Sequence, residues 1–171
     1  MIGGTTMSAQ AVARRGETLP GFTLPDGDGS AVFLESYRGR RNLAVVFAAD
    51  MMGESPVTAL LQELLSRTEE LTVEAAQVLA IVIPPYIAAQ RGPRGFLTLL
   101  DDGGHIHRAV GATDAAGRPA PAVFVTDRFR EIFAAYLPVS GRGLPSAKAI
   151  LEWLVFVNIQ CPECGVPEWP T

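Results

Sequence analysis

The chain has 171 residues, of which 48% are hydrophobic and 19% are charged. This length and composition predict one domain with a sizeable core, and they exclude disordered and fibrous architectures. The net charge is -4, and the basic side chains are spread along the chain without a long block, so we expect no nucleic-acid partner and no membrane partner.

The sequence shows no pattern for membrane insertion or export. Its longest strongly apolar run begins at Ala149, contains Glu152, and is far shorter than the roughly 20 residues of a spanning helix. No apolar stretch of signal-peptide length precedes Arg14. We therefore expect a cytoplasmic, reducing compartment, in which a close pair of cysteines favours metal binding or redox chemistry over a structural disulfide.

The first predicted elements are a hairpin and a buried strand. Extended runs at residues 21–24 and 31–34 flank an Asp-Gly turn and predict a β-hairpin. Residues 36–39 predict a short turn or helical piece. Residues 42–48 are rich in β-branched, aromatic and small apolar side chains, which is typical of a strand in a parallel sheet that is buried on both faces.

A well-marked helix is predicted next. Ser55 is a favourable N-cap, and Pro56 stands at the first helical position, where its missing N–H is not needed. The apolar residues that follow recur at helical spacing and predict one buried face. They are Val57, Leu60, Leu61, Leu64 and Leu65.

The second half of the chain predicts two strands, a hairpin and two helices. Strands at 77–83 and 96–100 would form a right-handed βαβ unit with the preceding elements. A short helix is expected at 106–110, and an antiparallel hairpin at 121–136. The last helix begins at Pro145-Ser146. Its expected buried residues are Ile150, Leu151, Leu154, Val155 and either Trp153 or Phe156.

Four segments in this order resemble a known superfamily. They are residues 16–24, 34–49, 100–111 and 120–127. Through them the chain is similar to the peroxiredoxin-like and thioredoxin-like proteins, the superfamily of alkyl hydroperoxide reductase, thiol-specific antioxidant and other redoxins. The resemblance implies an α/β, thioredoxin-like fold, in which helices flank a central mixed β-sheet and a β-hairpin precedes it.

The resemblance also implies a division of the chain into three parts. A flexible N-terminal tail is expected at 1–15 and the redoxin domain at 16–160. A C-terminal tail at 161–171 carries both cysteines of the chain, Cys161 and Cys164.

In that superfamily the chemistry lies in the loop before the first helix, where the helix N-terminus stabilises a cysteine thiolate. Aligned with a Cys-x-x-Cys pattern, the two positions hold Met52 and Ser55, and aligned with a Thr-Pro-Val-Cys pattern, the cysteine position holds Thr58. None of these side chains forms a thiolate, and the sequence offers no reason to place His105 or His107 beside them as a base. We expect no peroxidase activity at this loop.

By the same resemblance, Pro121 corresponds to a cis-proline that faces the loop and forms part of a substrate groove. From the residues alone, a strand-opening proline with a trans bond is the alternative. Met51 and Met52 either line this groove with Pro121 or are ordinary core or loop methionines.

The two histidines are expected on a helix. Helical geometry would point His105 and His107 about 200° apart, so that they could not share a metal, whereas a strand would put them on one face. The pattern of Ile106, Ala109 and Val110 favours the helix, so we expect solvated or capping histidines.

The tail sequence Cys161-Pro-Glu-Cys164-Gly resembles the metal knuckle of zinc ribbons and rubredoxins. A knuckle supplies two of the four ligands of a tetrahedral zinc, and a second copy of the chain would supply the others in a homodimer that also buries Trp169. A redox or resolving dithiol and an inert reduced pair are the alternatives.

Two functional hypotheses follow. In the first, the chain is a peroxiredoxin-like protein without peroxidase activity, which binds a peptide or a redox protein and carries zinc at Cys161 and Cys164 without any organic cofactor. In the second, these two cysteines are the redox dithiol of an active thiol-disulfide oxidoreductase or antioxidant enzyme.

Overall fold

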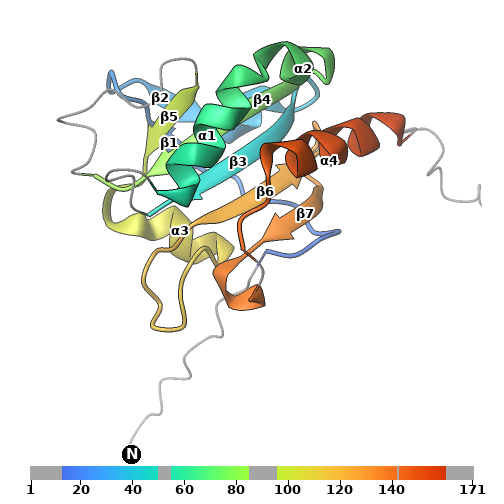
Figure 1. The fold of residues 1–171 in the computed structure, drawn as a ribbon. Coiled ribbons are helices and arrows are strands. Elements are labelled where there is room, and N and C mark those ends of the chain that lie inside the picture. Colours follow the sequence, from blue (N-terminus) through green and yellow to red (C-terminus); the bar gives the residue numbers. More distant parts are fainter. Residues whose placement is uncertain (1–12, 50–54, 85–95, 142, 161–171) are drawn as a thin grey trace, which may run out of the picture.

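The computed structural model describes residues 13–49, 55–84, 96–141 and 143–160. A mixed five-stranded sheet with the order β5-β4-β3-β6-β7 forms its centre, and a two-stranded hairpin, β1-β2, lies beside it (Figure 1). The strands are β1 (Thr23–Pro25), β2 (Ala31–Phe33), β3 (Asn42–Ala48), β4 (Ala76–Val82), β5 (Leu97–Leu100), β6 (Ala122–Thr126) and β7 (Ile132–Tyr136). The helices are α1 (Pro56–Ser66), α2 (Thr68–Val73), α3 (His105–Val110) and α4 (Ala147–Ile159), with short 3-10 turns η1 (Leu34–Tyr37), η3 (Asp102–Gly104) and η4 (Pro138–Ser140).

β3 is the central strand, as its apolar sequence predicts. It runs parallel to β4 and antiparallel to β6, and Val45 lies opposite Leu79 on one side and opposite Phe124 on the other. All of its residues are buried, and their side chains alternate between the two faces of the sheet. Ala44, Val46 and Ala48 belong to one core, and Leu43, Val45 and Phe47 belong to the other.

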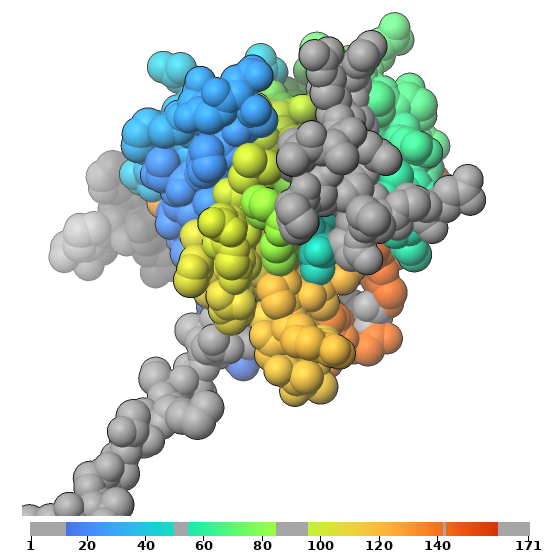
Figure 2. Space-filling view, turned by 90° about the vertical axis from the view of Figure 1, so that its left-hand side faces the viewer, coloured from blue at the N-terminus to red at the C-terminus, as the bar shows by residue number. Residues whose placement is uncertain are grey.

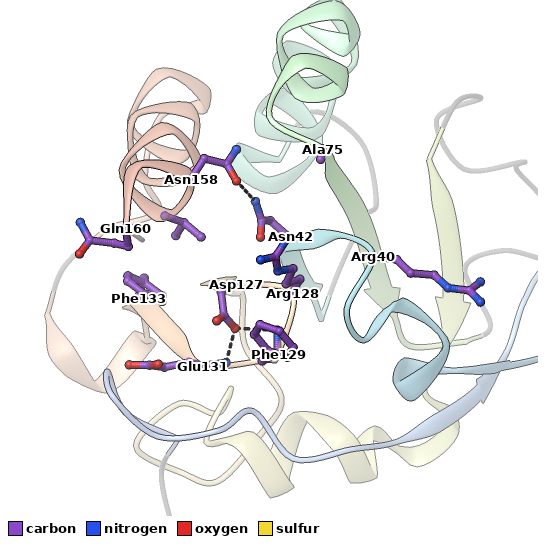
Figure 3. Close-up of a pocket in the computed structure, with 11 residues that line it drawn as sticks. Arg40, Asn42, Ala75, Asp127, Arg128, Phe129, Glu131, Phe133, Asn158 and Gln160 are labelled. Atoms are coloured by element: carbon purple, nitrogen blue, oxygen red, sulfur yellow. Dashed lines mark hydrogen bonds between the residues drawn. The ribbon is translucent and has the colours of Figure 1, made fainter. Parts of the chain in front are cut away.

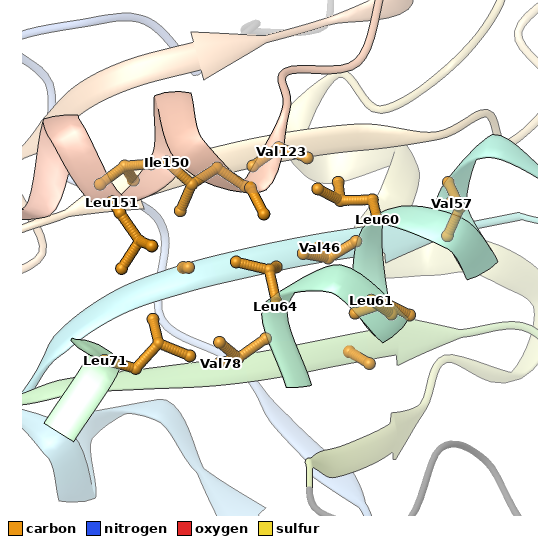
Figure 4. Close-up of a cluster of buried hydrophobic side chains, with 14 of the residues drawn as sticks. Val46, Val57, Leu60, Leu61, Leu64, Leu71, Val78, Val123, Ile150 and Leu151 are labelled. Carbon is orange, nitrogen blue, oxygen red and sulfur yellow. The ribbon is translucent and has the colours of Figure 1, made fainter. Parts of the chain in front are cut away.

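α1, α2 and α4 cover one face of the sheet. Figure 4 shows the core between them, in which Leu60, Leu61 and Leu64 of α1 pack against Val46 and the neighbouring strands. The predicted α1 is confirmed, with Ser55 as its N-cap and Pro56 in its first turn. Of the predicted apolar face, Val57, Leu60, Leu61 and Leu64 are buried, whereas Leu65 is half-buried.

The other face is covered by α3, the N-terminal hairpin and the segment before it. Figure 2 shows the hairpin beside β5, and Asp26 forms a bridge with Leu99 of that strand. Ala13, which the sequence placed in the flexible tail, is buried, and its N–H donates to the Val110 carbonyl at 3.3 Å. Contacts with the domain thus begin before residue 16.

One expectation about the helices was wrong, and one helix was not predicted. Val155 of α4 was predicted to be buried but is 44% exposed, whereas Val157 is buried and Trp153 is half-buried. The helix is apolar on several faces, so periodicity alone did not identify the face that meets the sheet. The sequence also did not predict α2, a short polar helix in which only Leu71 is buried.

The described part of the chain contains no helix that is both long enough and apolar enough to cross a membrane.

Candidate functional site

The start of α1 is built by two hydroxyl side chains. Ser55 has extended backbone angles, and its Oγ accepts a hydrogen bond from the Thr58 N–H at 3.2 Å. The two hydroxyl oxygens, Ser55 Oγ and Thr58 Oγ1, are 2.9 Å apart and hydrogen-bonded. Of the three positions indicated by the superfamily pattern, Ser55 therefore caps the 11-residue helix α1 and Thr58 lies in its first turn.

A groove of about 460 Å³ lies beside this turn. Its lining is predominantly apolar and comes from α1, the start of β6, the end of β7 and the segment before α4. The residues are Ser55, Pro56, Val57, Pro121, Tyr136, Leu137, Gly143 and Leu144. The Tyr136 hydroxyl accepts a hydrogen bond from Trp153 Nε1 at 3.0 Å, so its own O–H remains able to donate.

The structure brings Pro121 into the same groove as Ser55 and Pro56. The cis isomer of the Ala120–Pro121 bond remains a prediction. Met51 and Met52 lie outside the described residues, as do Cys161 and Cys164. The groove residues Tyr136, Leu137 and Leu144 were not predicted, because they come from distant segments and none belongs to a recognisable motif.

Within the described ranges, the hydroxyl pair has no hydrogen-bonded base. In the part of the chain that the structure describes, neither Ser55 nor Thr58 has a histidine or a carboxylate as a hydrogen-bond partner. An unassisted hydroxyl is a weak nucleophile at neutral pH, because almost none of it is ionised. The first turn of α1 can therefore orient and hydrogen-bond a ligand, but these side chains supply no thiolate.

The histidines lie on α3, as the predicted helix requires, but the expectation that both are solvated or capping was wrong. His105 is exposed, whereas His107 is fully buried and its Nδ1 lies 2.7 Å from Asp101 Oδ2. Burial alone would raise the pKa of Asp101, but hydrogen bonds from the His107 side chain and from the backbone N–H groups of His107 and Ile106 lower this pKa below its usual value. The hydrogen-bonded pair of Asp101 and His107 thus lies in the core.

α4 runs from the groove toward the other end of the domain. Leu144 lines the groove shortly before α4, and Gln160 is the residue that ends this 13-residue helix. At about 1.5 Å per residue the helix is about 20 Å long. Cys164 is only four residues beyond Gln160, and four extended residues span at most about 14 Å.

No group of three or more histidine, cysteine, aspartate or glutamate side chains that could hold a metal is present among the residues that the structure describes. His105 and His107 do not form a pair of ligands. Zinc at Cys161 and Cys164 remains a prediction about residues outside the described ranges.

A second pocket, which we call the distal pocket, lies at the other end of the domain (Figure 3). It has a volume of about 380 Å³. It is formed by the start of β3, the residue before β4, the β6–β7 turn and the end of α4. Its lining is Arg40, Asn42, Ala75, Asp127, Arg128, Phe129, Glu131, Phe133, Val157, Asn158 and Gln160. These residues come from four separate segments, so the sequence did not predict the pocket.

Solved structures with the same fold come from redox proteins. Mycobacterium tuberculosis AhpC is 16% identical with a TM-score of 0.68, and the match covers 90% of this chain and 99% of that one. Thiol peroxidase from Chromobacterium violaceum is 19% identical with a TM-score of 0.62, covering 86% and 90%. A protein described as thiol:disulfide interchange protein DsbE from Chlorobium tepidum is 18% identical with a TM-score of 0.61, covering 85% and 98%. These likenesses confirm the predicted thioredoxin-like fold.

A match to a family model identifies the family of the chain. No curated protein matches the chain. The model of the AhpC/TSA family, however, matches residues 15–135, which is more than half of the chain and includes α1, β3 and the start of β6. The chain therefore belongs to the AhpC/TSA family of thioredoxin-fold thiol oxidoreductases, as the four sequence segments predict.

Proposed function

We propose that this member of the AhpC/TSA family has no thiol peroxidase activity at the start of α1 and uses the adjacent groove to bind an apolar group of a peptide or a redox protein. The observation that carries the proposal is the hydrogen-bonded pair of Ser55 Oγ and Thr58 Oγ1, 2.9 Å apart, at the place where the family pattern calls for a cysteine. A hydroxyl pair lacks the low-pKa sulfur that attacks a peroxide or a disulfide.

The lining of the groove supports the binding role. Pro56, Val57, Leu137 and Leu144 give it a largely apolar wall, and Ser55 and Tyr136 are the residues of its lining that carry a hydroxyl group. An apolar concave site with a small number of oriented polar groups is the usual form of a ligand site. Pro121 is exposed at the start of β6 and gives an extended ligand access to the strand end.

For the cysteine pair we propose a metal knuckle, with zinc as the metal and a homodimer as the assembly that completes four sulfur ligands. The reach of the tail supports this role over catalysis in the groove, because about 14 Å of extended chain cannot span the roughly 20 Å length of α4. The proposal assumes a reducing compartment such as the cytoplasm, in which both thiols remain free to bind metal.

The rival function is an active oxidoreductase that uses Cys161 and Cys164 as its dithiol. Hydrogen peroxide consumption with a thiol reductant separates the two. We expect the wild-type protein to consume peroxide no faster than the Cys161→Ser/Cys164→Ser double variant. Wild-type turnover that the double variant loses would establish the dithiol enzyme and refute the proposed function.

A further inference from the structure

The distal pocket combines exposed aromatic rings with two arginines and two carboxylates. Phe129 is 47% exposed and Phe133 is half-buried, so both rings offer apolar surface to an occupant. The Arg128 guanidinium lies 5.4 Å from the centre of the Phe129 ring. In the described part of the chain, neither Arg128 nor Arg40 has a carboxylate partner within ion-pair distance.

Two carboxylates also line this pocket, those of Asp127 and Glu131. Asp127 Oδ1 accepts hydrogen bonds from the backbone N–H groups of Phe129 and Glu131, both at 2.8 Å. Figure 3 shows these two bonds next to the Phe129 ring. Arg40 and Arg128 are thus balanced by Asp127 and Glu131, so the aromatic rings are the main attraction for an occupant, and an acidic side chain must approach from the arginine side.

The segment nearest to this pocket is the tail of the chain itself. Gln160 lines the pocket and is the last described residue, so residues 161–171 begin at the pocket's rim. Trp169 follows nine residues later, and an extended chain of that length spans up to about 30 Å. A return to the rim therefore needs only one reversal of direction, and the Cys-Pro-Glu-Cys-Gly sequence is suited to a tight turn.

The apolar residues of the tail match the aromatic rings of the pocket. Glu163 and Glu168 are its charged side chains, it has no basic residue, and Val166 and Trp169 are its large apolar groups. Glu168 directly precedes Trp169, so an indole seated between the aromatic rings brings a carboxylate to the arginine side. The tether also gives the tail a high effective concentration at the pocket, which a free acidic peptide lacks.

We propose that residues 161–171 dock on their own domain, with Trp169 in the distal pocket between Phe129 and Phe133 and Glu168 paired with Arg128 or Arg40. This differs from the contact with a second copy that the sequence alone favours for Trp169. It is compatible with the proposed metal knuckle, because residues 161–165 precede the docked part and remain available to a metal. The docking does not depend on the proposed function of the groove.

Acrylamide quenching of Trp169 fluorescence tests this proposal. The chain has two tryptophans, so Trp153→Phe leaves Trp169 as the only emitter. We expect a quenching constant about threefold lower than that of a synthetic peptide of residues 160–171, because the indole is shielded. Adding Phe129→Ala or Arg128→Glu should raise the constant toward the peptide value, whereas Val139→Ala, at an exposed position away from the pocket, should not.

Three results would overturn the proposal. One is a quenching constant equal to that of the peptide. The second is shielding that persists in both pocket variants. The third is shielding that disappears on dilution over an about hundredfold range, which would place Trp169 on a second copy.

Hydrogen exchange gives a second readout if the Trp153→Phe variant does not fold. We expect the β6–β7 turn at residues 127–133 to exchange faster in Trp169→Ala than in the wild-type protein. Equal exchange in the two proteins would contradict docking at this pocket.

Discussion

The buried Asp101 carboxylate holds His107 at two points, the ring Nδ1 at 2.7 Å and the backbone N–H at 2.9 Å. Because an ionised carboxylate only accepts, Nδ1 of His107 is the donor in the first of these bonds. The ring packs edge-on against Phe47, and Nε2 is buried without a hydrogen-bond partner among the described residues. The pair therefore anchors α3 to the core beneath the sheet. Asp101 accepts hydrogen bonds from the backbone of Ile106 and from the backbone and ring of His107.

We expect Asp101→Asn to lower the free energy of unfolding by about 1–3 kcal/mol at neutral pH, because charge-assisted bonds to α3 are weakened. The pKa of Asp101 is lowered in the folded protein, so its contribution is fully present above the unfolded-state pKa of about 3.9 and is lost as the pH falls through the folded-state value. Urea unfolding at several pH values measures the difference between wild type and variant.

The difference between the two proteins should be largest near neutral pH and should shrink below about pH 4. Asp114→Asn is the matched control, since Asp114 also has a lowered pKa but pairs with the exposed Arg118 in a loop. If the two variants show the same loss of stability at neutral pH, the buried pair has no special role.

Arg130 joins the β6–β7 turn to the N-terminal segment. Its Nη1 donates to the Leu19 carbonyl at 2.9 Å, and Nη2 pairs with Glu35. We expect Arg130→Ala to destabilise the protein by about 1–3 kcal/mol, but Glu35→Gln by less than about 1 kcal/mol, because Glu35 is half exposed and solvent screens its charge. Urea unfolding with the exposed Arg38→Ala as control tests this. Equal effects of Arg130→Ala and Arg38→Ala would contradict it.

The elements with strong local signals were predictable from the sequence. Ser55 and Pro56 marked the start of α1 because capping is determined by neighbouring residues, and residues 42–48 marked β3 because a doubly buried strand has no polar face. The burial of His107 was not predictable. It depends on a carboxylate six residues away and on Phe47 in a different element, and no local pattern reports such a contact.

The N-caps of α1 and α4 should contribute about equally to the free energy of unfolding. Ser55 and Ser146 each accept a backbone N–H three residues on, at 3.2 Å and 3.1 Å. We expect Ser55→Ala and Ser146→Ala each to cost about 1 kcal/mol, and Ser55→Asp to retain most of the stability. Thermal unfolding measures these changes. A neutral Ser55→Ala would mean that the hydroxyl pair does not contribute to the start of the helix.

The groove should bind apolar probes. We expect the wild-type protein to bind the dye 8-anilinonaphthalene-1-sulfonate at the groove, and Leu144→Gln to weaken this binding about threefold or more, because apolar lining area is lost. Fluorescence titration gives the dissociation constants. Val139→Gln, at an exposed position outside the groove lining, is the control, and a change of equal size in that variant would locate the dye elsewhere.

Metal removal tests the role of the cysteine pair. If zinc bridges two copies through Cys161 and Cys164, the purified protein should contain about half a zinc atom per chain, and a chelator should convert a dimer into a monomer by light scattering. One zinc per chain in a monomer would indicate an intramolecular site. A metal-free protein that reversibly loses two thiols on oxidation would instead support the redox dithiol.

The most direct test of the central claim compares thiol reactivity at the start of α1 with reactivity elsewhere. In a Cys161→Ser/Cys164→Ser background, Thr58→Cys places a single thiol in the first turn of α1, and Val139→Cys places one at an exposed control position. The measurement is the rate constant with hydrogen peroxide at pH 7. We predict that Thr58→Cys reacts at least about tenfold faster than Val139→Cys, because the helix N-terminus lowers the thiol pKa, and that the wild-type chain shows no such reaction. Equal rates at the two positions, or a wild-type chain as reactive as Thr58→Cys, would contradict the account.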